Sequence, residues 1–205
     1  MITLRRVHRS TAIVVTLFAA VHVANHLMAL GSVNAHLRFM RAARLVYRQP
    51  LVEAVLLLCV AVQAVSGLAL LRTGWKRRTG AAAWLQAGSG ACLALFLAIH
   101  VAAVLFGRVV SGLDTNLHFA AAGLHVSPYQ AFFLPYYFLA VAALFTHLGC
   151  VVSRRAVRTP GLRAVVLGAS VCVGVVASAA ILAALMGALY PYEVPARYLA
   201  SFGPG

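Results

Sequence analysis

The sequence predicts an all-α membrane protein with five transmembrane helices, and three observations support this fold class. Hydrophobic residues make up 63% of the 205 residues and charged residues only 10%, which leaves too few polar side chains to cover a soluble fold. Five apolar runs reach the length of about 20 residues that a helix needs to cross a bilayer. Lysine and arginine gather in short clusters between these runs, as in loops near anionic headgroups. We therefore expect residues 1–205 to form a single integral membrane domain.

The five spans account for most of the chain. The first follows a basic segment with Arg5, Arg6 and Arg9, and it is too long for the apolar part of a signal peptide, so we expect it to be retained. A basic connection separates the second span from the third, and another separates the fourth from the fifth. The fourth span opens with aromatic residues suited to a membrane interface. We place the spans at about 11–30, 51–71, 84–106, 131–152 and 164–188.

The distribution of basic residues predicts the orientation of the chain. If the N-terminus lies inside, 11 of the 17 lysines and arginines fall on the inner side. Because Lys and Arg resist translocation, we expect the N-terminus inside and the C-terminus outside the cytoplasmic (inner) membrane. The net charge of +14 then reflects topology and lipid contact, and nucleic acid is not expected as a partner. Between the first two spans, an interfacial helix is predicted from the one-sided spacing of Arg38, Arg41, Arg44 and Arg48.

The remaining polar features lie in the connection of residues 107–130 and in the C-terminal tail. The side chains of Asp114, His118 and His125 are of types that can ligate a metal ion. Their spacing fits no known metal-binding signature, so we keep a metal site only as a minor hypothesis for this connection. The tail of residues 190–195 contains two prolines, cannot continue a helix, and should lie on the outer surface. The four cysteines fall inside apolar segments without a C-x-x-C pair, so we interpret them as small buried hydrophobes.

Four of the eight histidines lie inside predicted spans, where an ionisable side chain is costly and indicates a functional site. The alternative is a neutral histidine that hydrogen-bonds to a neighbouring helix. The arrangement of these histidines favours a functional site, because two of them occupy equivalent positions in an internal sequence repeat with an offset of 78 residues. The matched pairs are Thr11 with Ser89, Ala12 with Gly90, Phe18 with Phe96, and His22 with His100.

This repeat predicts a haem site. The first and third spans run in the same direction, so a parallel repeat can bring His22 and His100 face to face at similar depth. Two neutral imidazoles opposed across a bundle core ligate a haem iron from both sides. His26, one turn beyond His22, could replace it, contact a haem propionate or reach the interface; the repeat favours His22. We thus expect helices 1–2 and 3–4 to form a parallel pseudo-repeat, a four-helix core around haem.

The second and fourth spans carry a polar pair in the inner half of the bilayer. Their alignment places Gln63 opposite His147. A glutamine amide is a poor iron ligand, so an inner haem would be five-coordinate, ligated from elsewhere or absent. We favour a hydrogen bond between Gln63 and His147, because buried polar groups seek partners, and keep a bound inner haem as the alternative.

These residues carry a resemblance to a known family. The segment from Arg5 to Ala12, followed by Phe18-Ala-Ala-Val-His22-Val-Ala-Asn-His26, resembles the first helix of the cytochrome b membrane anchor of succinate:quinone oxidoreductases and fumarate reductases, in its single-chain, five-helix form. The third-helix pattern is similar at Leu85-Gln86, Gly90, Phe96 and His100. The segment 63–67 resembles the second helix, with glutamine where the family has histidine, and His147 sits where the fourth-helix histidine belongs. The resemblance covers about residues 5–155.

The resemblance implies a cofactor, a substrate and partners. His22 and His100 would hold the outer of two b haems, and His147 would be a ligand of the inner one. Because Gln63 departs from the pattern, we expect one haem b, with two as the alternative. Quinone would be the substrate. Iron–sulfur and flavoprotein subunits would be the partners, because the chain itself has no iron–sulfur motif and no flavin-binding motif.

Three further residues are candidates for quinone or proton contacts. Glu53, at the start of the second span, could accept a quinone-linked proton, although an acid in a first turn also complements the helix dipole. His8 and Ser10 lie at the inner interface, where related anchors contact quinone, although a basic anchor for lipid headgroups would also explain this segment.

The leading hypothesis is a b-type cytochrome that passes electrons between a partner and the quinone pool, as a non-catalytic or quinone-reactive subunit of an oxidoreductase. A haem-free structural anchor is the alternative. A small transporter is a third hypothesis. Transporters often have helices that glycine or proline interrupts at corresponding positions of a repeat, and the helices predicted for this chain lack such interruptions, which counts against the hypothesis.

Overall fold

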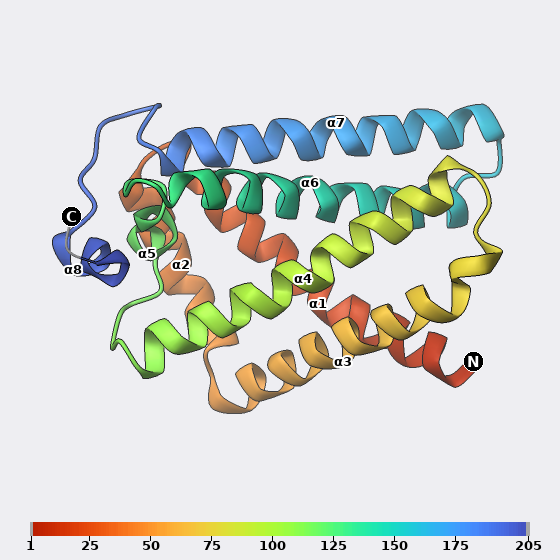
Figure 1. The fold of residues 1–205 in the computed structure, drawn as a ribbon, viewed down its shortest axis with the longest axis horizontal. Coiled ribbons are helices and arrows are strands. Elements are labelled where there is room, and N and C mark those ends of the chain that lie inside the picture. Colours follow the sequence, from red (N-terminus) through yellow and green to blue (C-terminus); the bar gives the residue numbers. More distant parts are fainter. Residues whose placement is uncertain (1, 204–205) are drawn as a thin grey trace.

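The computed structural model describes residues 2–203, and within that range it is helical and contains no β-strand (Figure 1). Five helices are long and apolar enough to cross a membrane, which confirms the predicted fold class and number of spans. The long helices are α1 (Ile2–Met28), α3 (Pro50–Gly74), α4 (Ala81–Val109), α6 (Gln130–Arg155) and α7 (Pro160–Leu185). The short ones are α2 (Val33–Tyr47), η1 (Trp75–Arg77), α5 (Leu117–Ala122), α8 (Ala196–Leu199) and η2 (Ala200–Phe202).

Local sequence signals explain where several helices begin. Pro50 and Pro160 start α3 and α7, where a missing backbone N–H and a fixed φ suit the first turn. Ser32 caps α2, because its hydroxyl accepts a hydrogen bond from the Ala35 N–H at 3.0 Å. Asn116 caps α5 in the same way, accepting from the His118 N–H at 2.9 Å.

The long helices pack in the order α1, α3, α4, α6 and α7. Small residues bring α6 and α7 together most closely, as is common between membrane helices. A Cβ at Gly174 would lie 2.8 Å from the Phe145 Cβ, and the Ser178 hydroxyl donates to the Phe138 carbonyl of α6 at 3.0 Å. This closely packed pair lies beside the other three helices.

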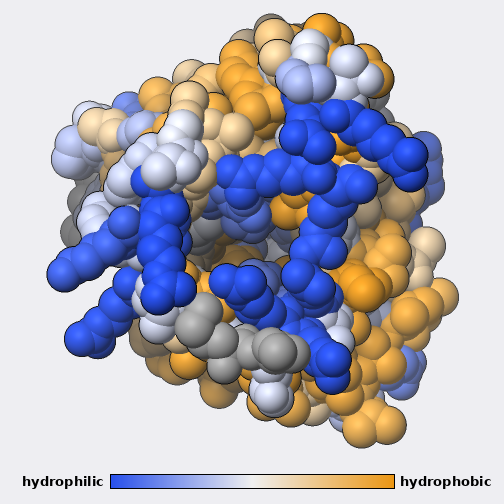
Figure 2. Space-filling view, turned by 90° about the vertical axis from the view of Figure 1, so that its right-hand side faces the viewer, coloured by the Kyte–Doolittle hydropathy of each residue, from blue (hydrophilic) through white to orange (hydrophobic). Residues whose placement is uncertain are grey.

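The bundle has two chemically different ends. The N-terminal end, as we call it, contains the N-terminus and the α3–α4 and α6–α7 connections; the C-terminal end contains α2, α5 and the tail (Figure 1). Eleven of the 17 basic residues belong to the N-terminal end, and Figure 2 shows basic side chains surrounding a hollow there. The three carboxylates, Glu53, Asp114 and Glu193, belong to the C-terminal end.

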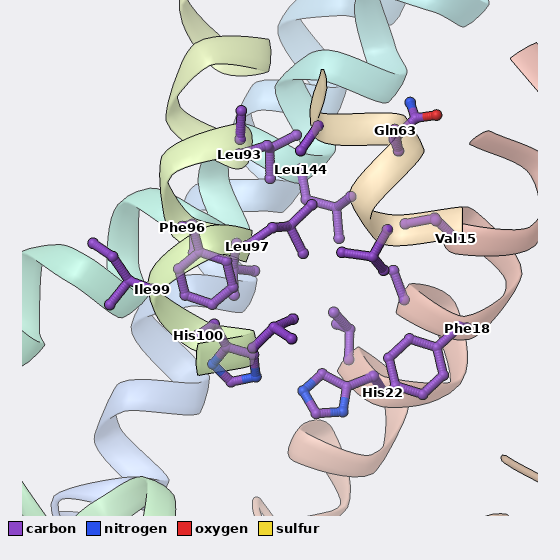
Figure 3. Close-up of a pocket in the computed structure, with 18 of the residues that line it drawn as sticks. Val15, Phe18, His22, Gln63, Leu93, Phe96, Leu97, Ile99, His100 and Leu144 are labelled. Atoms are coloured by element: carbon purple, nitrogen blue, oxygen red, sulfur yellow. The ribbon is translucent and has the colours of Figure 1, made fainter. Parts of the chain in front are cut away.

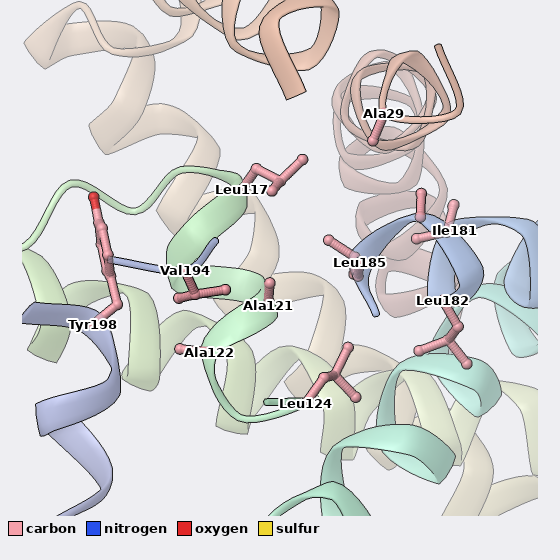
Figure 4. Packing of buried hydrophobic residues seen from close by; sticks show 11 residues of the cluster. Ala29, Leu117, Ala121, Ala122, Leu124, Ile181, Leu182, Leu185, Val194 and Tyr198 are labelled. Carbon is pink, nitrogen blue, oxygen red and sulfur yellow. The ribbon is translucent and has the colours of Figure 1, made fainter. Parts of the chain in front are cut away.

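A hydrophobic cluster closes the C-terminal end (Figure 4). Leu117 of α5 and Leu185 of α7 are buried in it together with Val194 and Tyr198 of the tail. The Tyr190 hydroxyl donates to the Ala29 carbonyl, which ties the tail to the end of α1. As expected, residues 191–195 do not continue the helix, and the tail packs onto the C-terminal end of the bundle.

The segment between the first two spans is helical, as predicted, but its arginines do not share one exposed face. Arg44 turns inward and donates to the Asp114 carboxylate at 2.6 Å. His36 and Met40 are buried, whereas Leu45 is exposed. Contacts with α5 explain the difference, because they give α2 a second buried side.

The cysteines are free, but only Cys150 is buried, and Cys172 is exposed on α7. The expectation of four buried cysteines is thus wrong for Cys172, whose exposed helix face is apolar and suited to lipid.

Candidate functional site

A cavity of about 1560 Å³ lies among α1, α3, α4 and α6. It is larger than the roughly 300–1,000 Å³ typical of ligand pockets, and protein interiors are otherwise close-packed. Its lining runs from Arg5 and Arg155 at the N-terminal end to Asn116 and Phe202 at the C-terminal end. Between these limits the walls are largely apolar, with one group of polar side chains toward each end.

His22 and His100 face each other across the cavity toward the C-terminal end (Figure 3). Their ring centroids are 6.0 Å apart, and the ring planes are inclined by 67°. Each imidazole is supported by the phenylalanine one turn earlier on its own helix. Phe18 stacks on His22 at 5.5 Å and 18°, and Phe96 stacks on His100 at 4.9 Å and 17°. The structure thus brings together the two histidines that the sequence paired.

The geometry of this pair fits an iron ion between the rings. A metal–imidazole bond is about 2 Å long, and the distance from nitrogen to ring centre adds about 1 Å on each side, so two axial imidazoles have centroids about 6 Å apart. The observed 6.0 Å matches this value. Imidazole nitrogen is also the donor that haem iron accepts most widely. The donor set and the adjoining space therefore both fit a haem.

His26 lies beside the pair and belongs to a second polar cluster. Its ring is 4.8 Å from that of His22 and 5.3 Å from that of His36. The Asn25 amide nitrogen donates to the His36 Nε2 at 3.2 Å. The Nδ1 atoms of His26 and His36 and the Asn25 Oδ1 are buried without a hydrogen-bond partner among the described residues. Buried polar groups are normally satisfied, so these three atoms distinguish the cluster from the rest of the packed interior.

His36 and Asn25 are site residues that the sequence analysis missed. His36 is 1% exposed, and burial lowers its pKa to about 4, with His22, Arg44 and His118 acting in the same direction. The sequence signal for the burial of His36 is its position one turn before Met40, on the apolar side of α2. That signal was weak, because the helix was expected to lie at an interface and not against the bundle.

Toward the N-terminal end, the cavity is lined by a histidine on each side. His8 of α1 has its Nδ1 at 2.9 Å from the Ser66 hydroxyl of α3 and its Nε2 at 3.2 Å from the Gln63 amide. The Gln63 Oε1 accepts from the Thr11 hydroxyl at 2.7 Å. These contacts join α1 to α3.

His147 makes the equivalent contacts between α6 and α4. Its Nδ1 lies 3.2 Å from both the Ser89 hydroxyl and the Gln86 carbonyl. The expected hydrogen bond between Gln63 and His147 is therefore wrong, because each side chain has partners on its own side of the cavity. Gln63 also lies away from the His22–His100 pair in Figure 3.

The remaining predicted site residues have other surroundings. Glu53 forms a two-point ion pair with Arg108 near the C-terminal end, which links the start of α3 to the end of α4. Ser10 is exposed and does not line the cavity, unlike His8.

The three candidate metal ligands in the connection between α4 and α6 each have other contacts. Among residues 2–203, no group of three or more His, Cys, Asp or Glu side chains could hold a metal ion. Asp114 pairs with Arg44, and His125 contacts the Leu185 carbonyl at 2.9 Å. Burial and the charge of Arg197 lower the pKa of His118, which packs near Tyr192 and Tyr198. These three residues thus belong to the packed C-terminal end.

Comparisons with known proteins give no match: no protein-family model, no curated protein and no solved structure corresponds to this chain.

Proposed function

We propose that this chain is a membrane-embedded b-type cytochrome that passes electrons between a partner protein and quinone. The observation that carries the proposal is the His22–His100 pair, with centroids 6.0 Å apart at the side of a large apolar cavity. A haem bound there would supply one-electron transfer. The protein would contribute two imidazole ligands, held in orientation by Phe18 and Phe96, and largely apolar walls around the group.

Several features of the chain support a role in quinone chemistry. Quinone is lipid-soluble, and the cavity lies among helices long enough to span the bilayer. The polar cluster of Asn25, His26 and His36 adjoins the haem pair and has unsatisfied buried atoms. These three side chains line the cavity, where polar groups would orient a quinone head group or exchange protons with it.

The N-terminal end is suited to a partner protein. It carries 11 basic residues, and no carboxylate belongs to it among residues 2–203. A surface with one sign of charge attracts and orients a partner of the opposite sign. An acidic redox subunit carrying flavin or iron–sulfur groups would meet this requirement.

The test is a reduced-minus-oxidised spectrum of the full chain in detergent, with haem measured per protein. We expect a b-type band, and we expect His22→Ala and His100→Ala each to remove one equivalent of haem. The matched control is His125→Ala, since His125 does not line the cavity and should leave the haem content unchanged. Absence of the band would overturn the proposal in favour of a haem-free anchor. An unchanged haem content in both variants would overturn the assignment of the ligands.

A further inference from the structure

Arginine side chains line the cavity where it reaches the N-terminal end. Three separate segments supply them: the first turns of α1, the connection between α3 and α4, and the last turn of α6. Figure 2 shows basic side chains surrounding the hollow at this end. We call this group the arginine mouth, and its members are Arg5, Arg9, Arg77, Arg78, Arg154 and Arg155.

The arginine mouth has no carboxylate partner among residues 2–203. Glu53 pairs with Arg108 and Asp114 pairs with Arg44, both at the C-terminal end, and Glu193 lies in the tail. Six like charges around one hollow repel one another and concentrate a positive potential there. The hollow is therefore electrostatically suited to an anion.

Hydrogen bonds hold two of the six guanidinium groups in place. The Arg78 guanidinium donates to the Leu71 and Leu70 carbonyls at 2.8 and 3.3 Å, at the end of α3. The Arg154 guanidinium of α6 donates to the Gln86 Oε1 of α4 at 2.8 Å. A guanidinium has five N–H donors in a planar fork that matches the oxygens of a phosphate. These bonds use two donors of Arg78 and one of Arg154, so donors remain on each for a phosphate.

Further inside, the cavity walls become apolar. Ala12 of α1, Leu68 and Leu71 of α3, and Leu148 and Val151 of α6 line it there. Each of them lies within about three turns of an arginine of the mouth along the chain. A ligand that suits both regions has an anionic head and a long apolar body.

The level of the arginine mouth in the bundle favours a lipid as this ligand. Helix α3 ends at Gly74 and α6 ends at Arg155, beside the mouth, and the ends of spanning helices lie at the level of lipid headgroups. An anionic phospholipid carries its phosphate at this level, and its acyl chain matches the apolar walls. An acidic peptide would instead place backbone N–H and C=O groups against those walls without partners, which is costly.

We propose that the arginine mouth binds one anionic phospholipid, whose phosphate contacts the guanidinium groups and whose acyl chain extends into the cavity. This site does not depend on haem, because the His22–His100 pair lies toward the other end of the cavity. It also leaves five of the 11 basic residues of the N-terminal end outside the cavity, where they can contact a partner protein. These five are Arg6, Arg72, Lys76, Arg158 and Arg163.

The experiment measures lipid binding to the full-length protein, purified in detergent and stripped of lipid. Native mass spectrometry would count bound phosphatidylglycerol, which is anionic, and phosphatidylcholine with the same acyl chains, which has no net charge. We expect one phosphatidylglycerol per chain to be retained at concentrations at which phosphatidylcholine is lost. Inorganic phosphate at the same concentration should not displace it, because phosphate lacks the apolar body that the walls accept.

Two triple variants with equal loss of charge test the location of the site. Arg9→Gln combined with Arg77→Gln and Arg155→Gln removes one arginine from each segment of the mouth. We expect the affinity for phosphatidylglycerol to fall by at least about tenfold, because charge-assisted hydrogen bonds to the phosphate are lost. The control triple removes exposed charges of the same end that do not line the cavity, and it should bind like wild type. It consists of Arg6→Gln, Lys76→Gln and Arg158→Gln.

The outcomes distinguish this site from a general attraction and from the proposed function. Equal losses in the two triple variants would overturn the site, because they would show that the net charge of the whole end attracts lipid. Equal retention of phosphatidylcholine would overturn the role of the arginines, and displacement by inorganic phosphate would overturn a lipid as the occupant. Haem is measured in the same samples. Selective lipid binding without haem would overturn the proposed function alone, whereas haem without selective lipid binding would overturn this inference alone.

Discussion

His36 is a buried titratable side chain whose protonation opposes folding. Its pKa is lowered from 6.5 to about 4 in the folded protein, so between these values the unfolded chain binds a proton that the folded chain does not. Stability is therefore present above pH 6.5 and falls as the pH drops toward 4, by about 3 kcal/mol at most. Thermal unfolding of the wild type should shift downward between pH 7 and pH 5, and His36→Gln should reduce that shift. Equal shifts in the two proteins would contradict a lowered pKa at His36.

The ion pair of Glu53 with Arg108 makes a second prediction at the residue scale. Removing one member leaves a partly buried charge without its partner, which destabilises a fold by about 1–3 kcal/mol. Glu53→Gln and Arg108→Gln should each lower the unfolding temperature, and the double variant should lose less than the sum of both. Glu193→Gln is the control, because Glu193 is exposed in the tail and makes no ion pair with a described residue. Additive losses would indicate that the two side chains do not interact.

Among single residues, the sequence predicted the side chains of the site better than their partners. The spacing of His22 and His100 in the repeat identified a pair that the structure places 6.0 Å apart. The partners of Gln63 and His147 were predicted wrongly, because comparing spans in sequence gives depth but not the rotation of each helix about its axis. Packing against neighbours sets that rotation, and here it turns both side chains toward adjacent helices.

The pairing of α6 with α7 depends on the absence of side chains at glycine positions. At Gly174, a Cβ would meet the Phe145 Cβ at 2.8 Å and the Ala142 backbone at 3.2 Å, neither of which can turn away. Gly174→Ala should therefore push the helices apart and destabilise the protein by about 1–3 kcal/mol. Gly168→Ala, on the same helix with open space around it, should be neutral or stabilising. We would measure both unfolding temperatures, and equal values would contradict tight packing at Gly174.

Among the elements, long helices were predictable and short ones were not. An apolar run of about 20 residues gives a spanning helix regardless of its neighbours, because lipid requires the backbone to be hydrogen-bonded internally. Helices α5 and α8 have six and four residues, and such short helices are marginal without tertiary contacts. Tyr198 is 1% exposed because residues distant in sequence surround it, including Asn116, whose amide donates to its hydroxyl at 3.0 Å. Only a three-dimensional arrangement reveals that burial.

For the whole molecule, the cavity and the charge asymmetry point to the same organisation. The cavity reaches from one end of the bundle to the other, and histidines line it toward both ends. His8 and His147 line the cavity near the basic N-terminal end, and the His22–His100 pair lies toward the packed C-terminal end. In the proposed function, electrons would enter or leave at the end suited to a protein partner and cross the bundle along this space.

The arrangement of the chain in the membrane is the prediction that belongs to the whole molecule. Eleven of 17 basic residues lie at the N-terminal end, so the positive-inside bias predicts that this end faces the cytoplasm. In a variant whose four cysteines are replaced by alanine, single cysteines at exposed positions of opposite ends can report the orientation. Glu193→Cys should react with a membrane-impermeant maleimide in intact cells, whereas Lys76→Cys should react only after the membrane is opened. The reverse pattern would place the basic end outside, away from any cytoplasmic redox partner. It would therefore contradict the proposed docking role of that end, while leaving the haem-ligand predictions untouched.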